Sequence, residues 1–571
     1  MEKLPDDCLS QIFFFLQDDK VSLHASILVN RQWCKNGIKD LWRQPFRLVM
    51  ADKNTEKYKS GNRISTGMLM EIVLSCLIDL SSYNPPRSYN LRNPSKATLG
   101  KAHVFNYIGF IRKLDLDDLG LAIAEWTEYC FSPMFNQNAE SVNHRNAVFS
   151  ALSPRRVTRF TSYKDLKGNN SFIKGITERI CKLLMMQIPR LDSISIKPVW
   201  FDRCVQPSAV ISEHFHESSA YSNITNEYLG LVTYPNANIC LSKLTEFSWI
   251  DNYPRSIQVI QELSSVATNI RKISFGISLK PYKGESSAFE AMISLIQVQS
   301  ALSDFELQNL EISSPLLMEA LARHKNVLTR LCFKCVNISA SEDIIEMVQF
   351  KKLEELIIIS SKLENTYHWP ISLSHFPNLI AFQIDDVCPT SIVTGIDEDH
   401  GTSGNQLCTF IYNQVIYNSE SARSILEAID HCTNLTYFEC NAEIDSINLL
   451  KQIFMSSTRL QTIIVKNRRR SLNINELLKV VRLTRLSHLE LEGSWRFTSD
   501  SLEVFLNNSN PPLKTLSLHY SSCFEDDHLE VLLRSLSGVL EKIDLKGMIK
   551  RLSFDSRKRA HQAFKEFYYG K

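Results

Sequence analysis

The side chains that could perform chemistry are few and widely separated in this 571-residue chain. Cys332 and Cys335 form a CxxC pair, but on an extended strand this spacing sends the two side chains to opposite faces, which does not suit one metal ion. His214 and His216 in the segment EHFHE could chelate a metal from one side of a strand, yet no second pair of ligands stands nearby in the sequence. We therefore predict structural cysteines and no metal site.

The sequence also lacks the motifs of nucleotide-binding and nucleophilic enzymes. No GxxxxGKS or GxGxxG element occurs, and the glycines of residues 395–405 (GIDEDHGTSGN) come without the lysine that such loops use to bind phosphate. Neither a catalytic cysteine nor a nucleophile elbow is indicated. These observations predict a protein that is not an enzyme and that binds no cofactor.

The bulk composition is that of a folded protein, with 44% hydrophobic and 22% charged residues. The formal net charge of +2 gives no general attraction to nucleic acid or to an anionic membrane. No apolar run approaches the roughly 18 residues of a membrane span, and the acidic N-terminus does not have the layout of a signal peptide. The 14 cysteines form no compact framework. We expect a soluble cytoplasmic or nuclear protein with free thiols and with neither nucleic-acid nor membrane partners.

The first 46 residues carry three short helix patterns, which would position any binding surface at this end. Pro5 suits the first turn of a helix, and Asp6 and Asp7 place negative charge at the positive end of the helix dipole. An amphipathic run over residues 23–37 follows, with Gly37 as its C-terminal cap, and a third pattern comes after it. One stripe of the first helix holds the large apolar side chains Leu9, Ile12, Phe13 and Leu16. A unit this small cannot bury all its apolar groups, so some of them should face a partner.

The pattern LPxxxLxxIFxxL and the later VxRxW and LW elements of this segment resemble an F-box, with Asn30 at a position where cysteine is usual. F-box proteins use this trihelical unit to dock on the Skp-type adaptor of SCF ubiquitin ligases. The resemblance therefore implies an adaptor partner and, through it, a cullin scaffold. The adaptor-binding residues that it implies are Leu4, Pro5, Leu9, Ile12, Phe13, Leu16, Val29, Arg31, Trp33, Leu41 and Trp42. The alternative is an N-terminal helical cap with an ordinary core.

A second pattern, LxxLxL, recurs through the rest of the chain. In the C-terminal half its leading residues are 25 to 28 positions apart, at Leu328, Leu353, Leu379, Leu407, Leu435, Leu460, Leu486, Leu513 and Leu540. Helix-like apolar runs, such as residues 449–454 and 529–536, lie between several of them. The series extends backward to Leu302, Ile270, Leu244 and Leu191, with 53 residues, or two steps, between the last two. One strand and one helix every 26 residues or so is the period of a leucine-rich repeat.

These repeats resemble the irregular leucine-rich kind found in F-box proteins. The predicted fold class is therefore α/β, with an F-box at 1–46, a helical linker at 47–100, a curved solenoid of parallel inner strands and outer helices at 101–550, irregular at 200–240, and a basic, aromatic tail at 551–571. Within these, residues 68–80 and 119–130 are expected to be helical. Phe564, Phe567 and Tyr568 in the tail have helical spacing and are expected to cover the end of the array. The alternative is a set of unrelated α/β units at coincidental spacing.

Alternate strand residues face opposite sides of a sheet, so the residues at offsets two, four and six from each leading residue should line one face, which is concave in a solenoid. On the nine C-terminal repeats this face mixes apolar residues with nearly balanced charges, which suits a protein partner better than a phosphate backbone. The residues expected to bind substrate are Ile357, Ile359, Ile411, Tyr437, Glu439, Ile464, His488 and Glu490. The alternative is a solvated inner sheet.

Two basic clusters, within residues 466–470 and 550–559, could serve as a nuclear address or an anion contact, although solvated surface is the simpler interpretation. Together the patterns predict the substrate-recognition subunit of an SCF-type ubiquitin ligase, which binds a protein substrate through its repeats. The alternative function is a leucine-rich-repeat interaction scaffold without a ligase role.

Overall fold

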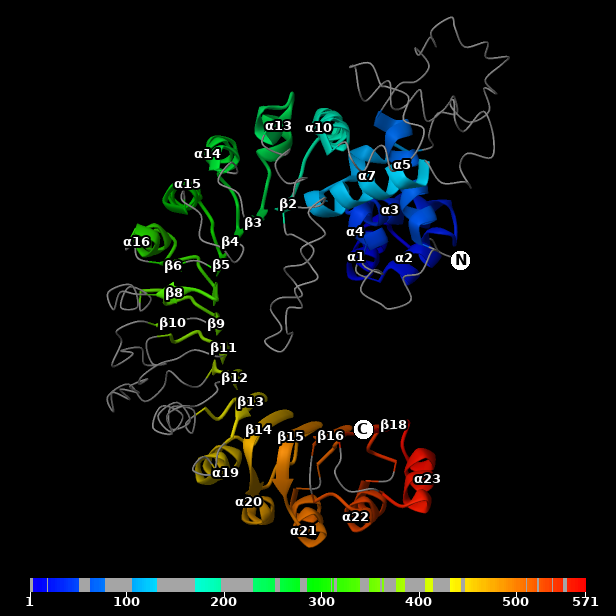
Figure 1. Ribbon diagram of the computed structural model, residues 1–571, viewed down its shortest axis with the longest axis vertical. Coiled ribbons are helices and arrows are strands. Elements are labelled where there is room, and N and C mark those ends of the chain that lie inside the picture. The colour runs from blue at the N-terminus through cyan, green and yellow to red at the C-terminus, as the bar shows by residue number, and fades with distance from the viewer. Residues whose placement is uncertain are drawn as a thin grey trace, which may run out of the picture. The chain divides into compact units, whose positions relative to one another are not determined.

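The structure is a computed structural model and describes residues 4–17, 19–50, 62–77, 105–130, 170–196, 230–251, 257–277, 285–309, 311–312, 316–338, 349–359, 362–363, 376–385, 406–413, 432–442, 447–509, 511–520, 523–536, 538–547 and 552–570. The chain divides into two compact units, residues 1–302 and 303–571, called unit 1 and unit 2 below. Parallel strands and helices alternate in both units (Figure 1). The predicted α/β class with a parallel sheet is therefore confirmed.

Unit 1 begins with three short helices, α1 (Asp6–Phe15), α2 (Lys20–Ile27) and α3 (Arg31–Leu41), drawn in blue in Figure 1. Together with the residues that flank them, 4–42, they are called the N-terminal helical module. Its small core consists of Leu9, Phe13 and Leu23, with Leu16, Trp33 and Leu41 packed against them. Three buried side chains are a small core, so much of the module's apolar surface lies outside it.

The helical conformation is interrupted between α2 and α3, where the sequence pattern predicts one continuous amphipathic helix over residues 23–37. Asn30 causes the break, because its side chain accepts a hydrogen bond from the Trp33 N–H at 2.9 Å and so caps the start of α3. Gly37 lies inside α3, where an added Cβ would come within 2.8 Å of Ile27 Cγ2 and 2.9 Å of Phe13 Cε1. The prediction that Gly37 ends a helix is therefore wrong. This glycine lets the three helices pack closely.

Four further α-helices described in unit 1 follow the module before residue 190. They are α4 (Pro45–Met50), α5 (Asn62–Leu77), α7 (Leu116–Cys130) and α10 (Asn170–Gln187). Helix α5 covers most of the helix predicted over 68–80, and α7 begins three residues before the predicted start at 119. Helices α5 and α7 pack together, and Trp126 Nε1 donates a hydrogen bond to Glu71 Oε1 at 2.6 Å. Residues 200–229 of the predicted irregular stretch 200–240 and the whole loop 395–405 lie outside the described residues.

The sheet of unit 1 consists of parallel strands β1 (Lys113–Asp115), β2 (Ser193–Ile196), β3 (Glu246–Asp251) and β4 (Lys272–Ile277), which pair in chain order. The short helix η3 (Ile108–Phe110) precedes β1, and the helices α13 (Ala237–Leu241), α14 (Ile257–Val266) and α15 (Glu285–Gln297) follow β2, β3 and β4 along the chain. Strand β2 pairs directly with β3. The 53 residues between Leu191 and Leu244 are therefore one lengthened step rather than the predicted two.

Unit 2 continues the alternation of strand and helix. Its main sheet contains β5 (Asp304–Gln308), β7 (Arg330–Lys334), β9 (Glu355–Ile359), β11 (Ala381–Asp385), β12 (Thr409–Asn413), β13 (Tyr437–Asn441), β14 (Thr462–Asn473), β15 (His488–Arg496), β16 (Thr515–His519), β17 (Lys542–Lys546) and β18 (Glu566–Gly570). The short strands β6 (Glu311–Ile312), β8 (Asn337–Ile338) and β10 (Lys362–Leu363) form a second sheet. The helices are α16 (Leu316–Ala322), α19 (Ile447–Ser456), α20 (Asn475–Val480), α21 (Ser499–Ser509), α22 (Asp526–Leu536) and α23 (Phe554–Ala563).

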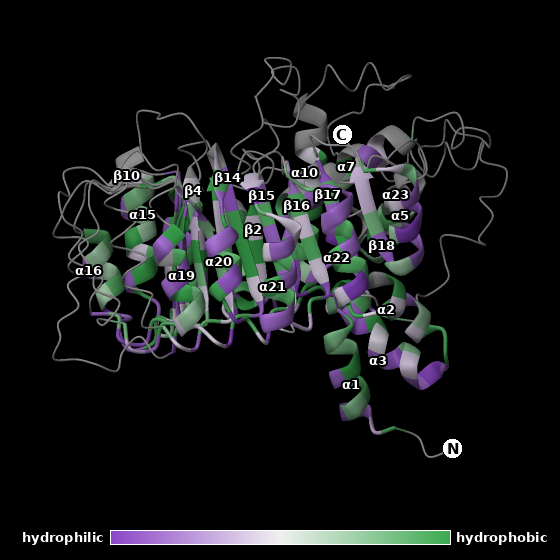
Figure 2. Ribbon diagram, turned by 90° about the horizontal axis from the view of Figure 1, so that it is seen from below, coloured by the Kyte–Doolittle hydropathy of each residue, from purple (hydrophilic) through white to green (hydrophobic). Residues whose placement is uncertain are grey.

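Helices of unit 2 are amphipathic, as a layer that covers a sheet requires. Figure 2 shows hydrophobic and hydrophilic residues together on α20, α21 and α22. Their apolar residues, such as Leu502 and Leu532, are buried together with the second and third apolar residues of the strands, such as Leu516 and Leu518. All nine leading leucines of the C-terminal repeats are buried as well. The LxxLxL pattern thus places its three apolar positions in the core.

One carbonyl per repeat fixes the start of the next strand. The carbonyl of the residue after most leading residues accepts two backbone N–H groups. The Ser303 carbonyl, for example, accepts those of Thr329 and Arg330 at 2.8 and 3.0 Å. This ladder of carbonyls extends to the residue that directly follows the N-terminal helical module, because the Arg43 carbonyl accepts the N–H groups of Arg112 and Lys113 at 2.9 and 3.0 Å. The repeat pattern of hydrogen bonds therefore starts at Arg43, well before the predicted boundary at residue 101.

Trp42 precedes that first ladder carbonyl and takes the place of a leading leucine. It is buried, and its ring stacks on Tyr107 with 4.4 Å between the ring centroids. The tail at the other end of the chain is a further repeat rather than an aromatic helix. Phe567 and Tyr568 belong to β18, which pairs with β17. The helical spacing predicted for Phe564, Phe567 and Tyr568 is wrong. Phe564 follows the end of α23 in extended backbone and is buried, and on β18 Phe567 is buried while Tyr568 is exposed.

Candidate protein-interaction surfaces

The N-terminal helical module exposes large apolar side chains that its small core leaves outside. Phe15 is 82% exposed, Val21 79% and Leu28 71%, and most of α1 has the colour of hydrophobic residues in Figure 2. We call the set the N-terminal apolar surface. It comprises Leu4, Ile12, Phe14, Phe15, Val21, Leu28 and Val29. Apolar groups concentrated on so short a segment are typical of a surface that another protein covers.

The predicted adaptor-binding residues divide into two groups in the structure. Leu9, Phe13 and Trp42 are buried, and Leu16, Trp33 and Leu41 are partly buried against the core. Leu4, Pro5, Ile12, Val29 and Arg31 are exposed. The sequence pattern did not single out Phe14, Phe15, Val21 and Leu28, which are also exposed. Their position next to a stripe that the core already occupies is the signal that could have identified them.

Hydrogen bonds between α1 and α3 hold this surface in place. Gln32 Nε2 donates to the Leu4 carbonyl and to Asp6 Oδ1, both at 2.9 Å, and Asn36 Nδ2 donates to the same Asp6 oxygen at 2.9 Å. The hydrogen bonds from Gln32 and Asn36 lower the pKa of Asp6. Asp6 is therefore ionised at neutral pH, and Gln32 links both Asp6 and the Leu4 carbonyl to α3.

In unit 2, the predicted substrate-binding residues lie side by side on one face of the sheet, called the unit 2 sheet face. The strand register places Ile357, Gln383, Ile411, Glu439, Ile464 and Glu490 in one row across β9 to β15. Ile359, Tyr437 and His488 lie on the same strands two residues away. All these side chains except Glu439 are half-buried. The structure thus brings the predicted set together.

An ionic cluster occupies the beginning of this face. Arg330 contacts Asp304 Oδ1 at 2.9 Å and Glu355 Oε2 at 3.0 Å, and Lys334 Nζ lies 2.7 Å from Glu306 Oε1. Burial raises the pKa of Glu306, but the hydrogen bond and charge of Lys334 outweigh it, so the pKa is lowered overall. The charges of this cluster are paired with one another.

A second cluster lies farther along the face, around Glu439. This carboxylate accepts hydrogen bonds from Lys466 Nζ at 2.6 Å, Asn413 Nδ2 at 2.7 Å and the Tyr437 hydroxyl at 2.8 Å. Burial alone raises the pKa of Glu439, and the three donors lower it overall. Glu490 lies 3.6 Å from His488 Nε2, and the hydrogen bond from His488 is the largest of the influences that lower its pKa.

Between the two clusters the face is more apolar. Ile357, Ile359 and Ile411 are half-buried there, next to Gln383 and Asp385. A half-buried isoleucine offers apolar area that a partner can cover, whereas the flanking charges already have partners within the sheet. This arrangement suits a folded protein or a peptide better than a polyanion.

Three residues of the basic clusters predicted from the sequence make contacts within unit 2. Lys466 pairs with Glu439, as described above. Arg559 pairs with Glu530 in α22, and the Arg557 guanidinium lies 5.5 Å from the centre of the Tyr569 ring. Residues 468–470 are part of β14, where its register to β15 shifts between Asn467 and Leu472.

The described residues offer little for catalysis. No group of three His, Cys, Asp or Glu side chains among them is arranged to hold a metal ion, and His214 and His216 lie outside them. Cys332 is buried, which raises its pKa to about 12 and keeps the thiol protonated. A cavity of about 40 Å³ lies in the core between β14, β15 and the neighbouring helices, and only apolar side chains such as Phe454 and Trp495 line it. Such a void is too small and too apolar for a substrate.

Comparison of the sequence with protein-family models and with curated proteins finds no match. Among the helices of the described segments, none is long and apolar enough to cross a membrane.

Proposed function

We propose that the protein is the substrate-recognition subunit of an SCF-type ubiquitin ligase. In this proposal the N-terminal helical module acts as an F-box and binds a Skp-type adaptor, which links it to a cullin scaffold. The repeats form a leucine-rich-repeat solenoid, and the unit 2 sheet face binds a protein substrate. The chain would contribute binding and proximity, raising the effective concentration of substrate lysines near the transferred ubiquitin, rather than catalytic groups.

The observation that carries the proposal is the N-terminal apolar surface. Leu4, Ile12 and Val29 belong both to the F-box pattern of the sequence and to this surface. Leu9 and Phe13, which belong to the same pattern, form the core. A module whose apolar spacing served only its own stability would have no need to expose Leu4, Ile12 and Val29.

Co-purification with a Skp-type adaptor tests the proposal. The variant Leu4→Ala, Ile12→Ala, Phe15→Ala removes apolar area from the surface and leaves the core intact, so it should fold and lose the adaptor. A control variant, Val480→Ala, Val504→Ala, Val539→Ala, removes exposed apolar groups from unit 2 and should retain the adaptor. Equal retention by all three proteins, or no retention by the unchanged chain, would contradict the proposal.

A leucine-rich-repeat scaffold without a ligase role is the second candidate, because the unit 2 sheet face alone would serve it. The two functions differ in the fate of the bound partner. A receptor should lower the level of its partner in a ubiquitin-dependent way, and the triple variant should abolish this loss while still binding the partner. A scaffold should leave the partner's level unchanged.

A further inference from the structure

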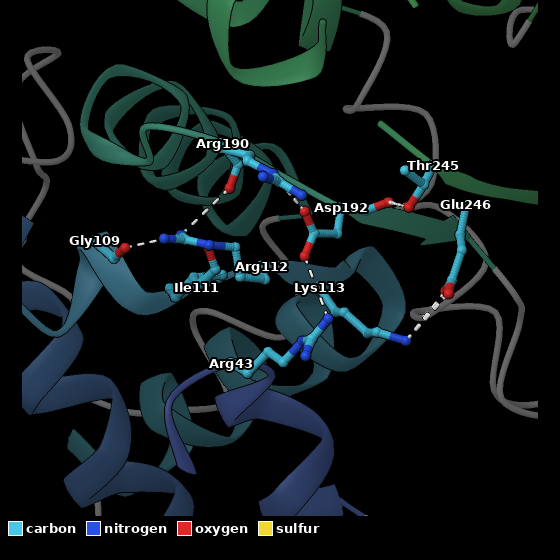
Figure 3. A network of polar contacts seen from close by, with 9 residues as sticks. All are labelled: Arg43, Gly109, Ile111, Arg112, Lys113, Arg190, Asp192, Thr245 and Glu246. Atoms are coloured by element: carbon cyan, nitrogen blue, oxygen red, sulfur yellow. Dashed lines mark hydrogen bonds and ion pairs between the residues drawn. The ribbon is translucent and has the colours of Figure 1, made fainter. Parts of the chain in front are cut away.

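Three arginines of unit 1 gather around a single carboxylate, Asp192 (Figure 3). Arg43 follows the N-terminal helices, Arg112 precedes β1, and Arg190 precedes β2. Arg43 Nη2 lies 3.3 Å from Asp192 Oδ2, and Arg190 Nε lies 2.7 Å from Asp192 Oδ1. Asp192 thus joins two elements that are 149 residues apart in the chain.

Arg112 is the third arginine of the group, and its hydrogen bonds go to backbone carbonyls rather than to a carboxylate. Its Nη1 donates hydrogen bonds to the carbonyls of Gly109 and Ile111, both at 2.8 Å, and to that of Arg190 at 3.5 Å. Burial lowers the pKa of Arg112, the charge of Asp192 opposes this, and the charges of Arg190 and Arg43 lower it further. The three guanidinium groups are therefore close enough to repel one another.

The charges in this group do not balance. Three guanidinium cations lie near one carboxylate, which only Arg43 and Arg190 contact, and the neighbouring Lys113 is already paired with Glu246 at 3.2 Å (Figure 3). The Arg43 Nε atom is buried and has no hydrogen-bond partner. Each guanidinium carries five N–H donors, and the contacts described above use only a minority of them. Excess positive charge and unused donors in a partly buried place are the features of an anion site.

We propose that Arg43, Arg112 and Arg190, called the arginine cluster, bind a phosphate group. The forked guanidinium matches the geometry of phosphate oxygens and can donate two parallel hydrogen bonds to them. A doubly charged phosphate would neutralise the excess charge of the cluster. The site is accessible, because the Arg190 side chain is 53% exposed and the Arg43 side chain 26%. This site is separate from the surfaces that carry the proposed function.

Calorimetric titration of the full chain with inorganic phosphate and with O-phosphoserine, at constant ionic strength and against chloride, tests the site. Arg190→Gln removes one cation and should weaken binding by about three- to tenfold, the effect of one exposed charge-assisted hydrogen bond. Asp192→Asn removes the competing carboxylate and should strengthen binding by a similar factor. The control Arg459→Gln makes the same change of charge in unit 2, where Arg459 contacts Asn434, and should leave binding unchanged.

Phosphate affinity is expected to fall in Arg190→Gln and to rise in Asp192→Asn. These opposite changes distinguish a binding site from a structural network. If the cluster only stabilises the fold, both variants should lower the melting temperature and neither should change phosphate binding. Binding of both ligands assigns the site to the phosphate group itself, and binding of inorganic phosphate alone assigns it to the free ion. Absence of binding, or equal binding by all variants, would overturn the proposal.

Discussion

The N-terminal apolar surface and the unit 2 sheet face differ in how far their side chains already interact within the chain. The N-terminal apolar surface consists of side chains such as Phe15 that make few contacts within the chain, so a partner gains most of their burial. On the unit 2 sheet face, charges such as Glu439 are already paired within the sheet, here with Lys466. A partner there gains little from the pairs and must rely on Ile357 and its apolar neighbours. The difference predicts that the N-terminal apolar surface would bind its partner strongly and without rearrangement. The unit 2 sheet face would bind its partner more selectively.

The largest effects should come from residues that separate core from surface in the N-terminal helical module. Phe13→Ala should destabilise the module by about 3–5 kcal/mol, because Phe13 is fully buried. Phe15→Ala should change its stability by less than about 0.5 kcal/mol, because Phe15 is 82% exposed. Hydrogen exchange of α1 to α3 measures both. Similar losses for the two variants would mean that Phe15 packs on the folded chain.

A smaller effect should follow from breaking a pair on the unit 2 sheet face. Lys466→Met leaves the partly buried Glu439 carboxylate without its cation and should cost roughly 1–3 kcal/mol. Adding Glu439→Gln to that variant should recover part of the loss, since a neutral amide tolerates the site better. A double-mutant cycle from thermal unfolding of the four proteins checks this coupling. Additive losses would contradict it.

Acid should weaken the unit 2 sheet face. The folded-state pKa values of Glu306 and Glu439 are lowered from 4.5, so the unfolded chain binds more protons in this range. Their contribution to stability is complete above about pH 4.5 and is lost as the pH falls through the lowered values. The melting temperature of a Glu306→Gln, Glu439→Gln variant should therefore depend less on pH between 5 and 3. An unchanged slope would show that other carboxylates dominate.

The smallest effect should come from an exposed pair of unit 2. Arg559 and Glu530 join α23 to α22, and their side chains are 51% and 42% exposed. Arg559→Ala should cost less than about 1 kcal/mol, because solvent and salt screen such pairs. A melting curve beside that of Lys466→Met makes the comparison. Equal shifts would mean that burial does not distinguish the two pairs.

The repeat architecture could be predicted because burial imposes a period on the sequence. Each leading leucine, from Leu328 to Leu540, is buried at the position the pattern gives it. Features that depend on contacts between residues far apart in the sequence could not be predicted from the pattern. Gly37 packs against Phe13 and Ile27, and neither partner can be inferred from a local signal. The register of β18, the strand that contains Phe567, is set by its pairing with β17, which a local sequence pattern does not show.

The candidate surfaces followed the same division. Alternation along strands was enough to predict the unit 2 sheet face, because strand geometry fixes which side chains share a side. It did not reveal that Asn413 and Lys466 converge on Glu439, since they come from three different strands. In the N-terminal helical module, the pattern identified important positions without separating the core residue Phe13 from the exposed residue Ile12.

The ladder of carbonyls has a mechanical consequence. Because the Arg43 carbonyl accepts the N–H groups of Arg112 and Lys113 just as a repeat carbonyl does, pulling the N-terminal helices from the sheet breaks the same kind of bonds as pulling neighbouring repeats apart. The Arg43–Asp192 ion pair adds a further attachment at that point. A load applied at the helices is therefore passed to β1 and β2 through these hydrogen bonds and this ion pair.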